Sequence, residues 1–588
     1  MSVFHSIARL PFEALRTGAS ITKFVRRDRP HSLAGRLFAP TPLRVGAFLA
    51  GAFVLSPAFA SAFNGDSQAP TACPAAPPSN LAVLAPAWAP EDLQDGAMVE
   101  GAASPQQAAD ALAQARTEEQ ASFARILSER SAVTVPNPAI LALSARQRAE
   151  LDAEPAPETA VPKIGTAIDV GQAVDFAGLD GARLRPGGES VHGGIAGRTD
   201  RGSLVWEMAV ASPDAKALRL EFADLALAPG VELYVYNEDG QVWGPYGGSG
   251  PDGNGGFWSP SLFGDTARVH LRADDSAALA ASHFTLSRVM HLGARVGALQ
   301  DRIRDRYAVG PVPNDVSFCG AQVPDCTQNA MCWLGANPGL AAAADAVAHL
   351  QFVNGGSAYI CSGAYLAQSG NAPQQPYLMT ANHCFSTSAS ANSLEAFFKF
   401  RTTACDGGCV TRDGVPRVNG ATLLATGAIP TSADFTLVRL SGFPAGGARL
   451  LGWTAAQVPE GAQLAHLGHP AGSPLAFSYR LYRYNNASLP HASDWDEPTF
   501  LYSGLASASS DWAGTTAGGS SGGPALLPTS DGGALFVGQL TGAAGMQDPV
   551  NRCDPNATST VDGAYRASYP SVRRFVYDRI FRGSFETP

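Results

Sequence analysis

The chain has 588 residues, more than one hydrophobic core usually serves, so we expect two or more domains. Its formal net charge is −10 and 16% of its residues are charged, which argues against a nucleic-acid-binding protein, a coiled coil and a charge-rich disordered chain. Hydrophobic residues make up 45% of the chain, and its 62 glycines and 43 prolines predict many turns and short strands rather than an all-helical protein.

The first segment, residues 1–62, is typical of a secretory signal with an extended basic region. Arginines precede an apolar run from Val45 to Leu55, and small residues follow at Ala58 and Ala60. The alternative is a transmembrane anchor, but the apolar stretch is short and Pro57 interrupts it. We therefore expect a secreted, extracellular protein that is periplasmic only in transit and has no membrane association after the signal is removed.

The next two segments differ in their hydrophobic patterns. Residues 63–165 are rich in Ala and Pro, with one helical stretch from Ser104 to Arg130. Residues 166–300 show alternating apolar and polar residues, as in Leu218–Phe222 and Glu232–Tyr236. This alternation predicts a β-sandwich-like domain, either a pro-region or a permanent accessory domain.

A basic linker, residues 301–310, precedes a cysteine-rich part, residues 311–582, that holds eight of the nine cysteines. After export, an even set of cysteines predicts disulfides. The CxxxC at Cys405 and Cys409 has no matching second pair, and the HxxH at His466 and His469 is on a strand-like stretch, so we expect no metal site.

Three short segments of this part carry residues suited to nucleophilic catalysis. His383 ends one apolar run, Asp434 begins another, and Ser521 lies among glycines. A serine hydroxyl is a poor nucleophile until an imidazole takes its proton, and the imidazole needs a carboxylate to fix its tautomer. We therefore expect these three side chains to converge. Taken singly, each has a structural alternative: a core histidine, a turn aspartate and a loop serine.

The order of these residues along the chain selects between two folds. The glycines around Ser521 fit the GxSxG motif of α/β-hydrolases, but that fold needs a histidine after the serine, and the last one here is His491. The order His383, Asp434, Ser521 is instead that of the two-barrel architecture. The glycines let the backbone turn so that the N–H groups of Gly519 and Ser521 face a developing oxyanion.

At these residues the chain resembles the chymotrypsin-like serine peptidases, and within them the bacterial lysyl endopeptidase group. The resemblance covers about Gly310 to Phe581 and rests on Thr380–Cys384, Ser432–Leu437, Gly519–Gly522 and Val537–Leu540. It implies a mostly β fold in which two barrels flank the active site. It also implies a serine endopeptidase that acts on polypeptides without a cofactor, with His383 as general acid/base, Asp434 as its orienting group, Ser521 as nucleophile and Gly519 as an oxyanion donor.

The resemblance also bears on the substrate. A pocket for Lys or Arg needs a carboxylate. Thr515 stands where trypsin has its pocket acid, whereas Asp562 matches the position that lysyl endopeptidases use, although Asp-Gly is also a common turn signal. Thr541 stands where lysyl endopeptidases have a histidine, which argues against a strict preference for Lys.

By analogy to the same family, we expect four disulfides. Cys361 would pair with Cys384, Cys326 with Cys553, and Cys332 with Cys405 or Cys409, and Cys319 would take the remaining cysteine of that last pair.

Ser520 suggests how the protein matures. Many animal trypsin-like enzymes have an Asp at this position, where it pairs with a newly formed N-terminus, and Ser520 cannot form that ion pair. We therefore expect activation by removal of a pro-region, residues 64 to about 310, that covers the cleft, with cleavage after Arg302, Arg304 or Arg306.

An alternative function is that of a secreted protein- or carbohydrate-binding protein on a protease scaffold. In that case the β-domain would be the binding module, with a site lined by its aromatic residues Trp243, Tyr246, Phe257 and Trp258. Such a scaffold would be expected to have lost a member of the triad, and none is missing.

Overall fold

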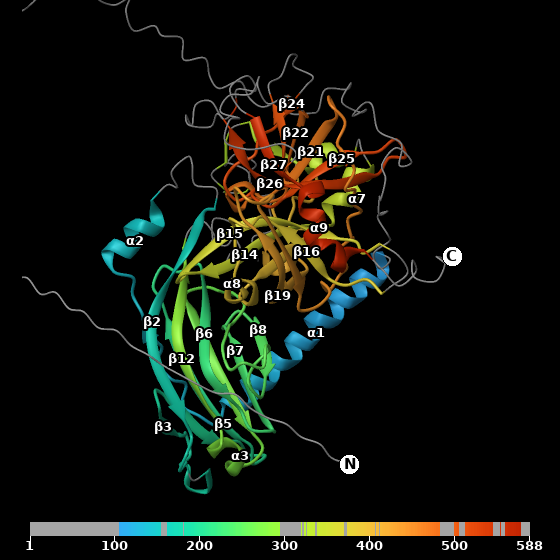
Figure 1. Cartoon of the computed structure of the whole chain (residues 1–588). Coiled ribbons are helices and arrows are strands. Elements are labelled where there is room, and N and C mark those ends of the chain that lie inside the picture. The colour runs from blue at the N-terminus through green and yellow to red at the C-terminus, as the bar shows by residue number, and fades with distance from the viewer. Residues whose placement is uncertain are drawn as a thin grey trace, which may run out of the picture. The chain divides into compact units, whose positions relative to one another are not determined.

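The computed structural model describes residues 105–577, apart from the gaps 154–160, 180, 294–318, 320, 322, 325, 336–337, 370–372, 406, 411, 483–498, 505–511, 545–552 and 554–558. Strands dominate this part of the chain, as Figure 1 shows. Residues 1–62 and the basic linker 301–310 lie outside the described residues, as does Cys73. No described helix is long and apolar enough to cross a bilayer.

The predicted N-terminal helix is present as α1 (Pro105–Arg130). Ile126 on its buried side packs with Tyr234 and Tyr236 of the β-sheet that follows. A second helix, α2 (Ala145–Asp152), begins at a capping box in which Ser144 and Gln147 satisfy each other's backbone N–H groups.

The strands between residues 163 and 292 fall into two sheets, and we call residues 163–293 the β-domain. One sheet has the order β3-β4-β5-β11-β7-β8, with β1 beside β5, and the other contains β10-β6-β12-β2, with β9 beside β6. The strands are β1 (Ala139–Ile140), β2 (Lys163–Asp175), β3 (Glu189–Val191), β4 (Gly194–Arg198), β5 (Leu204–Ala211), β6 (Ala217–Ala226), β7 (Val231–Tyr236), β8 (Val242–Tyr246), β9 (Phe257–Trp258), β10 (Leu262–Phe263), β11 (Thr266–Ala273) and β12 (His283–Leu292), with the short helices η2 (Gly181–Arg183) and α3 (Ser276–Ala280) between them.

Alternation along β6 explains how the two sheets of the β-domain pack together. Leu218, Leu220 and Phe222 point into a core that also contains Trp206 of β5 and Phe284 of β12. Phe222 stacks on Phe257, one of the aromatic residues considered for a binding site. In the structure Phe257 belongs to the core instead, being only 6% exposed.

The C-terminal part, residues 319–577 as described, contains two curled β-sheets, which confirms the predicted mostly β, two-barrel architecture (Figure 1). The first holds β14 (Val347–Asn354), β15 (Ser357–Leu366), β16 (Tyr377–Thr380), β17 (Glu395–Phe398), β18 (Arg417–Asn419), β19 (Ala421–Gly427) and β20 (Phe435–Leu440). The second holds β13 (Gln328–Asn329), β21 (Gln463–Gly468), β22 (Ala476–Leu481), β23 (Phe500–Gly504), β24 (Trp512–Ala513), β25 (Pro524–Pro528), β26 (Ala534–Ala544) and β27 (Ser559–Ala564). The helical segments are α6 (Met331–Leu334), α7 (Pro338–Ala344), α8 (Ser388–Asn392), η3 (Arg412–Gly414), η4 (Pro470–Gly472) and α9 (Tyr565–Val576).

The four disulfides pair the cysteines as predicted. They join Cys319 to Cys409, Cys326 to Cys553, Cys332 to Cys405 and Cys361 to Cys384. All four lie within the C-terminal part. They restrict the unfolded chain, so they stabilise a domain whose core is divided between two sheets.

The β-domain and the C-terminal part share one sheet, because β2 pairs antiparallel with β15. This pairing gives a twelve-stranded sheet that begins in the β-domain and ends in the first barrel.

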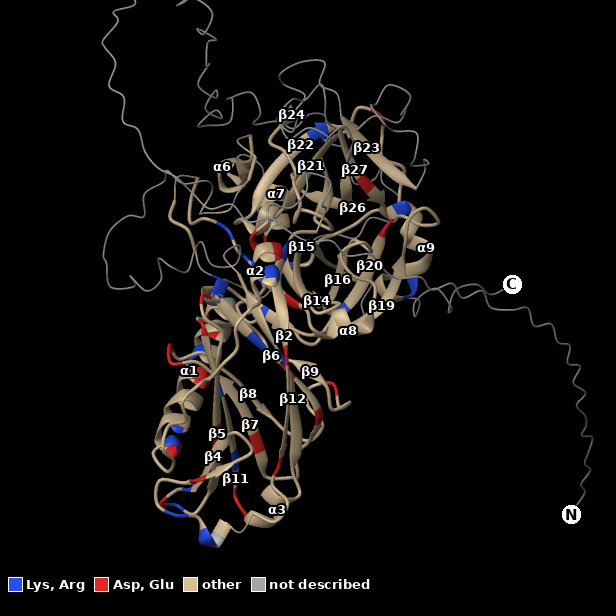
Figure 2. Cartoon of the chain, turned by 90° about the vertical axis from the view of Figure 1, so that its left-hand side faces the viewer, with Lys and Arg blue, Asp and Glu red and all other residues tan. Residues whose placement is uncertain are grey.

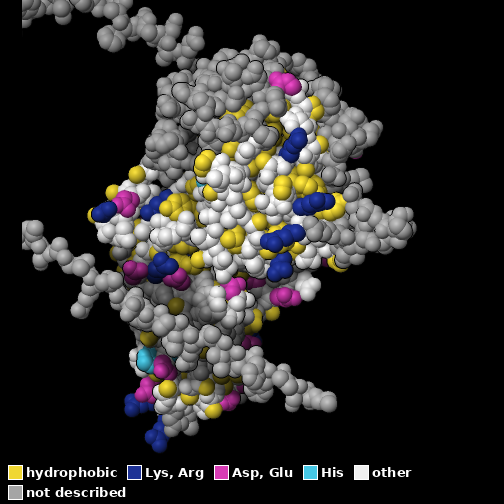
Figure 3. All heavy atoms as spheres, in the orientation of Figure 1, with side chains coloured by type: hydrophobic (Ala, Val, Ile, Leu, Met, Phe, Trp, Pro, Cys, Tyr) yellow, Lys and Arg dark blue, Asp and Glu magenta, His cyan; other side chains and the backbone are white. Residues whose placement is uncertain are grey.

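Acidic and basic residues occur along both parts of the chain rather than separated by sign (Figure 2). On the face shown in Figure 3, small apolar groups lie among polar atoms and charges of both signs in the described region.

Candidate active site

His383 and Asp434 form a paired contact at the end of two first-barrel strands. His383 follows β16, and Asp434 directly precedes β20, which pairs with β16. The Nδ1 atom of His383 lies 2.6 Å from Oδ2 of Asp434, and the backbone N–H of His383 donates to Oδ1 over 2.9 Å. Because an ionised carboxylate only accepts hydrogen bonds, Nδ1 carries the proton and the Nε2 lone pair is left for another donor.

Asp434 is buried, and a contact from the second barrel holds its backbone. Its side chain is 1% exposed, and its backbone has a positive φ of 49°, which is uncommon for a residue other than glycine. Gln539 of β26 donates from Nε2 to the carbonyl oxygens of Ala433 (2.6 Å) and Asp434 (3.2 Å). The Gln539 contact therefore fixes the backbone from which Asp434 projects.

Ser521 lies on a tight turn whose glycines are required by close approaches. Gly519 has φ +97°, and a Cβ there would lie 2.8 Å from the carbonyl oxygen of His469. A Cβ at Gly522 would lie 2.1 Å from Oγ1 of Thr380, three residues before His383. A side chain at Gly522 would push the serine turn away from Thr380, and one at Gly519 would collide with the backbone of His469 and Ala471.

Two further contacts hold the serine turn against the first barrel. Ser362 of β15 donates its N–H to the carbonyl of Ser521 (2.8 Å) and its hydroxyl to the carbonyl of Gly519 (2.9 Å). The sulfur of Cys384, which is bonded to Cys361, lies 3.7 Å from the carbonyl oxygen of Ser521. The disulfide thus ties β15 to the residue after His383, beside the serine turn.

The three predicted triad residues therefore lie in one region between the two barrels. Ser521 is 3% exposed, and the His383 side chain is 23% exposed. The buried Nε2 atom of His383 has no hydrogen-bond partner among the described residues.

Asp562 is placed differently from an open pocket acid. It lies inside β27, between Leu540 of β26 and Leu501 of β23, so the Asp-Gly pair is part of a strand rather than a turn. The carboxylate is fully buried, and both of its oxygens lie within hydrogen-bond distance of Nε2 of His466, at 3.0 and 2.9 Å. His466 thus covers the acid that the resemblance assigns to the pocket.

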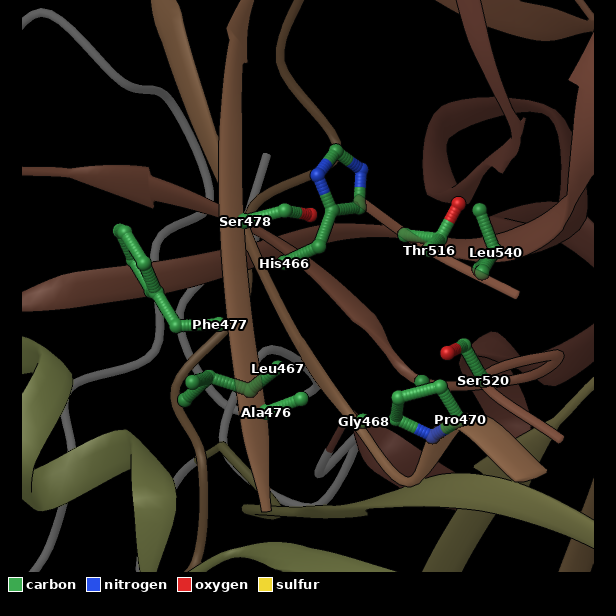
Figure 4. A pocket seen from close by; sticks show the side chains of 11 residues that line it. His466, Leu467, Gly468, Pro470, Ala476, Phe477, Ser478, Thr516, Ser520 and Leu540 are labelled. Atoms are coloured by element: carbon green, nitrogen blue, oxygen red, sulfur yellow. The ribbon is translucent and has the colours of Figure 1, made fainter. Parts of the chain in front are cut away.

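A small pocket lies next to the serine turn (Figure 4). His466, Thr516, Ser520 and Leu540 are among the residues that line it. In Figure 4 the His466 ring stands between Ser478 and Thr516, at some distance from Ser520. His466 lines this pocket, whereas the Asp562 carboxylate that it contacts does not.

The remaining predicted site residues are also buried. Thr541, the residue after Leu540, is 4% exposed, and its hydroxyl has no hydrogen-bond partner in the described part of the chain. Thr515 is likewise 4% exposed. His469, the second histidine of the HxxH pair, bonds through Nδ1 to the carbonyl of Ser473 (3.0 Å). His466 and His469 thus have different partners within the fold.

Sequence reasoning missed the supporting roles of Ser362, Gln539 and His466. Each acts on a residue that is distant in the chain: 157 residues separate Ser362 from Gly519, 106 separate Gln539 from Ala433, and 96 separate His466 from Asp562. Gln539 lies in the Val537–Leu540 motif, so its position was noted but its contact was not. For Ser362, no local pattern marked the contact.

A paired histidine and buried aspartate beside a glycine-flanked serine, on two curled sheets, resemble the arrangement of the chymotrypsin-like serine peptidases. Residues 321–554 match the family model "Lysyl endopeptidase, C-terminal domain". This match confirms the resemblance to the lysyl endopeptidase group of trypsin-like serine peptidases over that segment.

A curated relative from Pseudomonas aeruginosa strain PAO1, named lysyl endopeptidase, is 29% identical over 202 residues. The match covers 34% of this chain and 40% of the relative. Among solved structures, the protease Anisep from Arthrobacter nicotinovorans is 14% identical, with 40% of this chain and 95% of that chain covered and a TM-score of 0.27. The thermostable serine protease AL20 from an extremophilic microorganism is 14% identical, with 39% and 99% covered and a TM-score of 0.26.

Proposed function

We propose that this protein is a secreted serine endopeptidase that cleaves polypeptides through an acyl-enzyme. His383 accepts the Ser521 proton at Nε2 as the hydroxyl attacks the scissile carbonyl, and Asp434 stabilises the imidazolium through the 2.6 Å contact to Nδ1. The N–H groups of Gly519 and Ser521 are the candidate donors to the oxyanion. His383 then protonates the leaving amine, and a water molecule releases the acyl group by the same route.

The single observation that carries this proposal is the pairing of His383 with the buried Asp434 beside the serine turn. That pairing fixes the tautomer in which Nε2 can act as a base.

Two serines provide the test. Ser521→Ala should lower kcat for a casein digest by a factor on the order of 10⁶, because triad members act as a unit. Ser190→Ala is the matched control, being the same change at an exposed serine of β3, and should retain the activity. Thermal unfolding of both variants checks that the fold is intact. Unchanged hydrolysis by the Ser521→Ala protein would refute the assignment.

For specificity, we propose cleavage after a basic residue, with Asp562 supplying the negative charge through His466. Both oxygens of Asp562 face His466, so the acid acts from behind the imidazole rather than by direct contact. A neutral imidazole that donates from Nε2 to Asp562 presents its Nδ1 lone pair, which an ammonium or guanidinium group can use. In the described residues, this Nδ1 atom has no hydrogen-bond partner.

Asp562→Asn tests this assignment, because it removes the charge and keeps the shape. The ratio of kcat/KM for an Arg substrate to that for a Leu substrate should fall, since the cation loses its counter-charge. The Leu substrate serves as the internal control for damage to the triad. Equal losses on both substrates would show that Asp562 and His466 form a structural pair only.

We propose further that the mature protein is produced by cleavage after Arg302, Arg304 or Arg306. These residues lie outside the described part of the chain. The proposal is supported by the sequence at this boundary and by Ser520, which provides no carboxylate to pair with a new N-terminus.

A further inference from the structure

The surface between the β-domain and the C-terminal part is built partly from backbone pairing. Ser357 and Ala358 at the start of β15 face Thr166 and Gly165 of β2. The N–H of Ala167 donates to the carbonyl of Gly356 over 2.8 Å, and the N–H of Ile360 donates to the carbonyl of Pro162 over 3.2 Å. Without β2, this end of β15 would be an unpaired sheet edge, which natural proteins generally protect.

An apolar cluster crosses the same surface. Ile164, Met290 and Leu292 of the β-domain pack with Ala358 and Ile360 of the C-terminal part. Each of these five side chains is at most 1% exposed. Separation of the two parts would therefore expose apolar surface on both sides, which water disfavours.

A buried charge cluster, centred on Glu395 of β17, forms the third element of this surface. Glu395 is fully buried, and its Oε1 accepts from the backbone N–H of Ser261 (2.9 Å) while its Oε2 accepts from the Ser261 hydroxyl (2.6 Å). Arg219 of the β-domain lies 3.4 Å from Oε2, and Arg417 of the C-terminal part lies 3.1 Å from Oε1.

The two arginines of this cluster are themselves held across the surface. Arg219 is 1% exposed, and it donates to the carbonyl of Ser393 in the C-terminal part over 2.7 Å. Burial lowers the pKa of Arg219, and the charge of Glu395 opposes that shift. The guanidinium of Arg417 lies 4.0 Å from the ring centre of Trp243 in the β-domain and also faces Phe397 of β17. Trp243 is thus engaged at this surface, not in an open binding site.

These contacts bear on the protein that the proposed cleavage after Arg302, Arg304 or Arg306 would produce, and the inference rests on that cleavage. We propose that the β-domain stays bound to the C-terminal part after the chain is cut between residues 294 and 318, so that the active form is a two-piece, non-covalent complex. The four disulfides formed by described residues all lie on the C-terminal side of the cut, so none of them links the two pieces. The β-domain would then be a permanent partner of the enzyme rather than a segment that is shed.

The test uses the full chain with Ser521→Ala and a recognition site for a specific viral protease inserted after Arg306. This background makes the outcome independent of the proposed catalysis. After cutting, size-exclusion chromatography in low salt and in about 1 M NaCl should show both pieces in one peak, because buried pairs are screened little by salt. If the cut protein with an unaltered contact surface elutes as two separate peaks of folded pieces, the proposal is overturned.

Glu395→Gln in the same background removes the charge at the centre of the cluster. It leaves Arg219 and Arg417 without their shared carboxylate, so the two pieces should bind at least about 100-fold more weakly, as expected when one partner of a buried ion pair is lost. The matched control is Glu150→Gln, the same change in the exposed Arg146–Glu150 pair of α2, which should leave binding unchanged. Equal binding by the two variants would show that the charge cluster does not hold the pieces together.

If Glu395→Gln fails to fold as a full chain, Trp243→Ala serves in its place. This change removes the ring over Arg417 at the surface and leaves the buried carboxylate in place. It should weaken binding of the cut pieces by a smaller factor, about 10-fold, as expected for a partly desolvated cation–π contact. No measurable change relative to the Glu150→Gln control would count against a contribution from this contact.

Discussion

Gln539 is a side chain whose effect on catalysis would pass through another residue. Its amide donates to the carbonyls of Ala433 and Asp434, and the side chain is fully buried. Asp434 sits at a positive φ, a conformation that persists only when its surroundings determine it. Gln539 is thus a positioning residue for the aspartate.

We expect Gln539→Leu to lower kcat by about tenfold with little change in KM, because a misplaced aspartate weakens stabilisation of the imidazolium in the transition state. Gln539→Glu keeps the length and should not restore activity, since it loses the N–H donor. Steady-state kinetics on one peptide substrate distinguishes the two parameters. A change confined to KM would place Gln539 in substrate binding instead.

At the scale of the elements, the sequence predicted best the helices, strands and motifs that depend on residues close together in the chain. The helix at Pro105–Arg130 and the strands β6 and β7 follow from hydrophobic periodicity, and the triad segments stood out as a histidine, an aspartate and a serine in a diagnostic order. The disulfide pairs came from family analogy, and the structure has the same pairs. Periodicity and motif order carry this information because each depends on neighbours within a few residues.

Contacts between distant elements could not be predicted in the same way. Arg219 lies on the alternating strand β6, where a polar residue is normally expected to face solvent. In the structure the face of β6 that carries Arg219 is buried as well, and Arg219 donates to the carbonyl of Ser393, 174 residues away. The sharing of a sheet by β2 and β15 likewise has no local signature, because either strand alone is compatible with an exposed edge.

For the whole molecule, buried histidines make stability depend on pH. Burial lowers the pKa of His469 to about 3 and that of His291 to about 4, and it lowers the pKa of His349 well below its usual value. In the unfolded chain these groups titrate near about 6.5. Between those values the unfolded state binds more protons than the folded state, so stability rises with pH in this window and is lost as pH falls.

We expect the free energy of unfolding to fall by about 1.4 kcal/mol per pH unit for each such histidine between about pH 6 and about pH 4. His469→Gln removes one of these groups, so its stability should depend less steeply on pH over that window. Urea unfolding of both proteins at several pH values measures the difference. Parallel curves for the variant and the parent would show that His469 takes up a proton in the folded state.

The most direct test of the central claim is covalent labelling of the nucleophile. A fluorophosphonate reacts with a serine only when a neighbouring base activates it. We predict that peptide mapping of the labelled protein places the adduct on Ser521, and that His383→Ala abolishes labelling while the four disulfides remain intact. An adduct on Ser520 or another serine, or labelling that persists without His383, would contradict the proposed His383–Asp434–Ser521 mechanism.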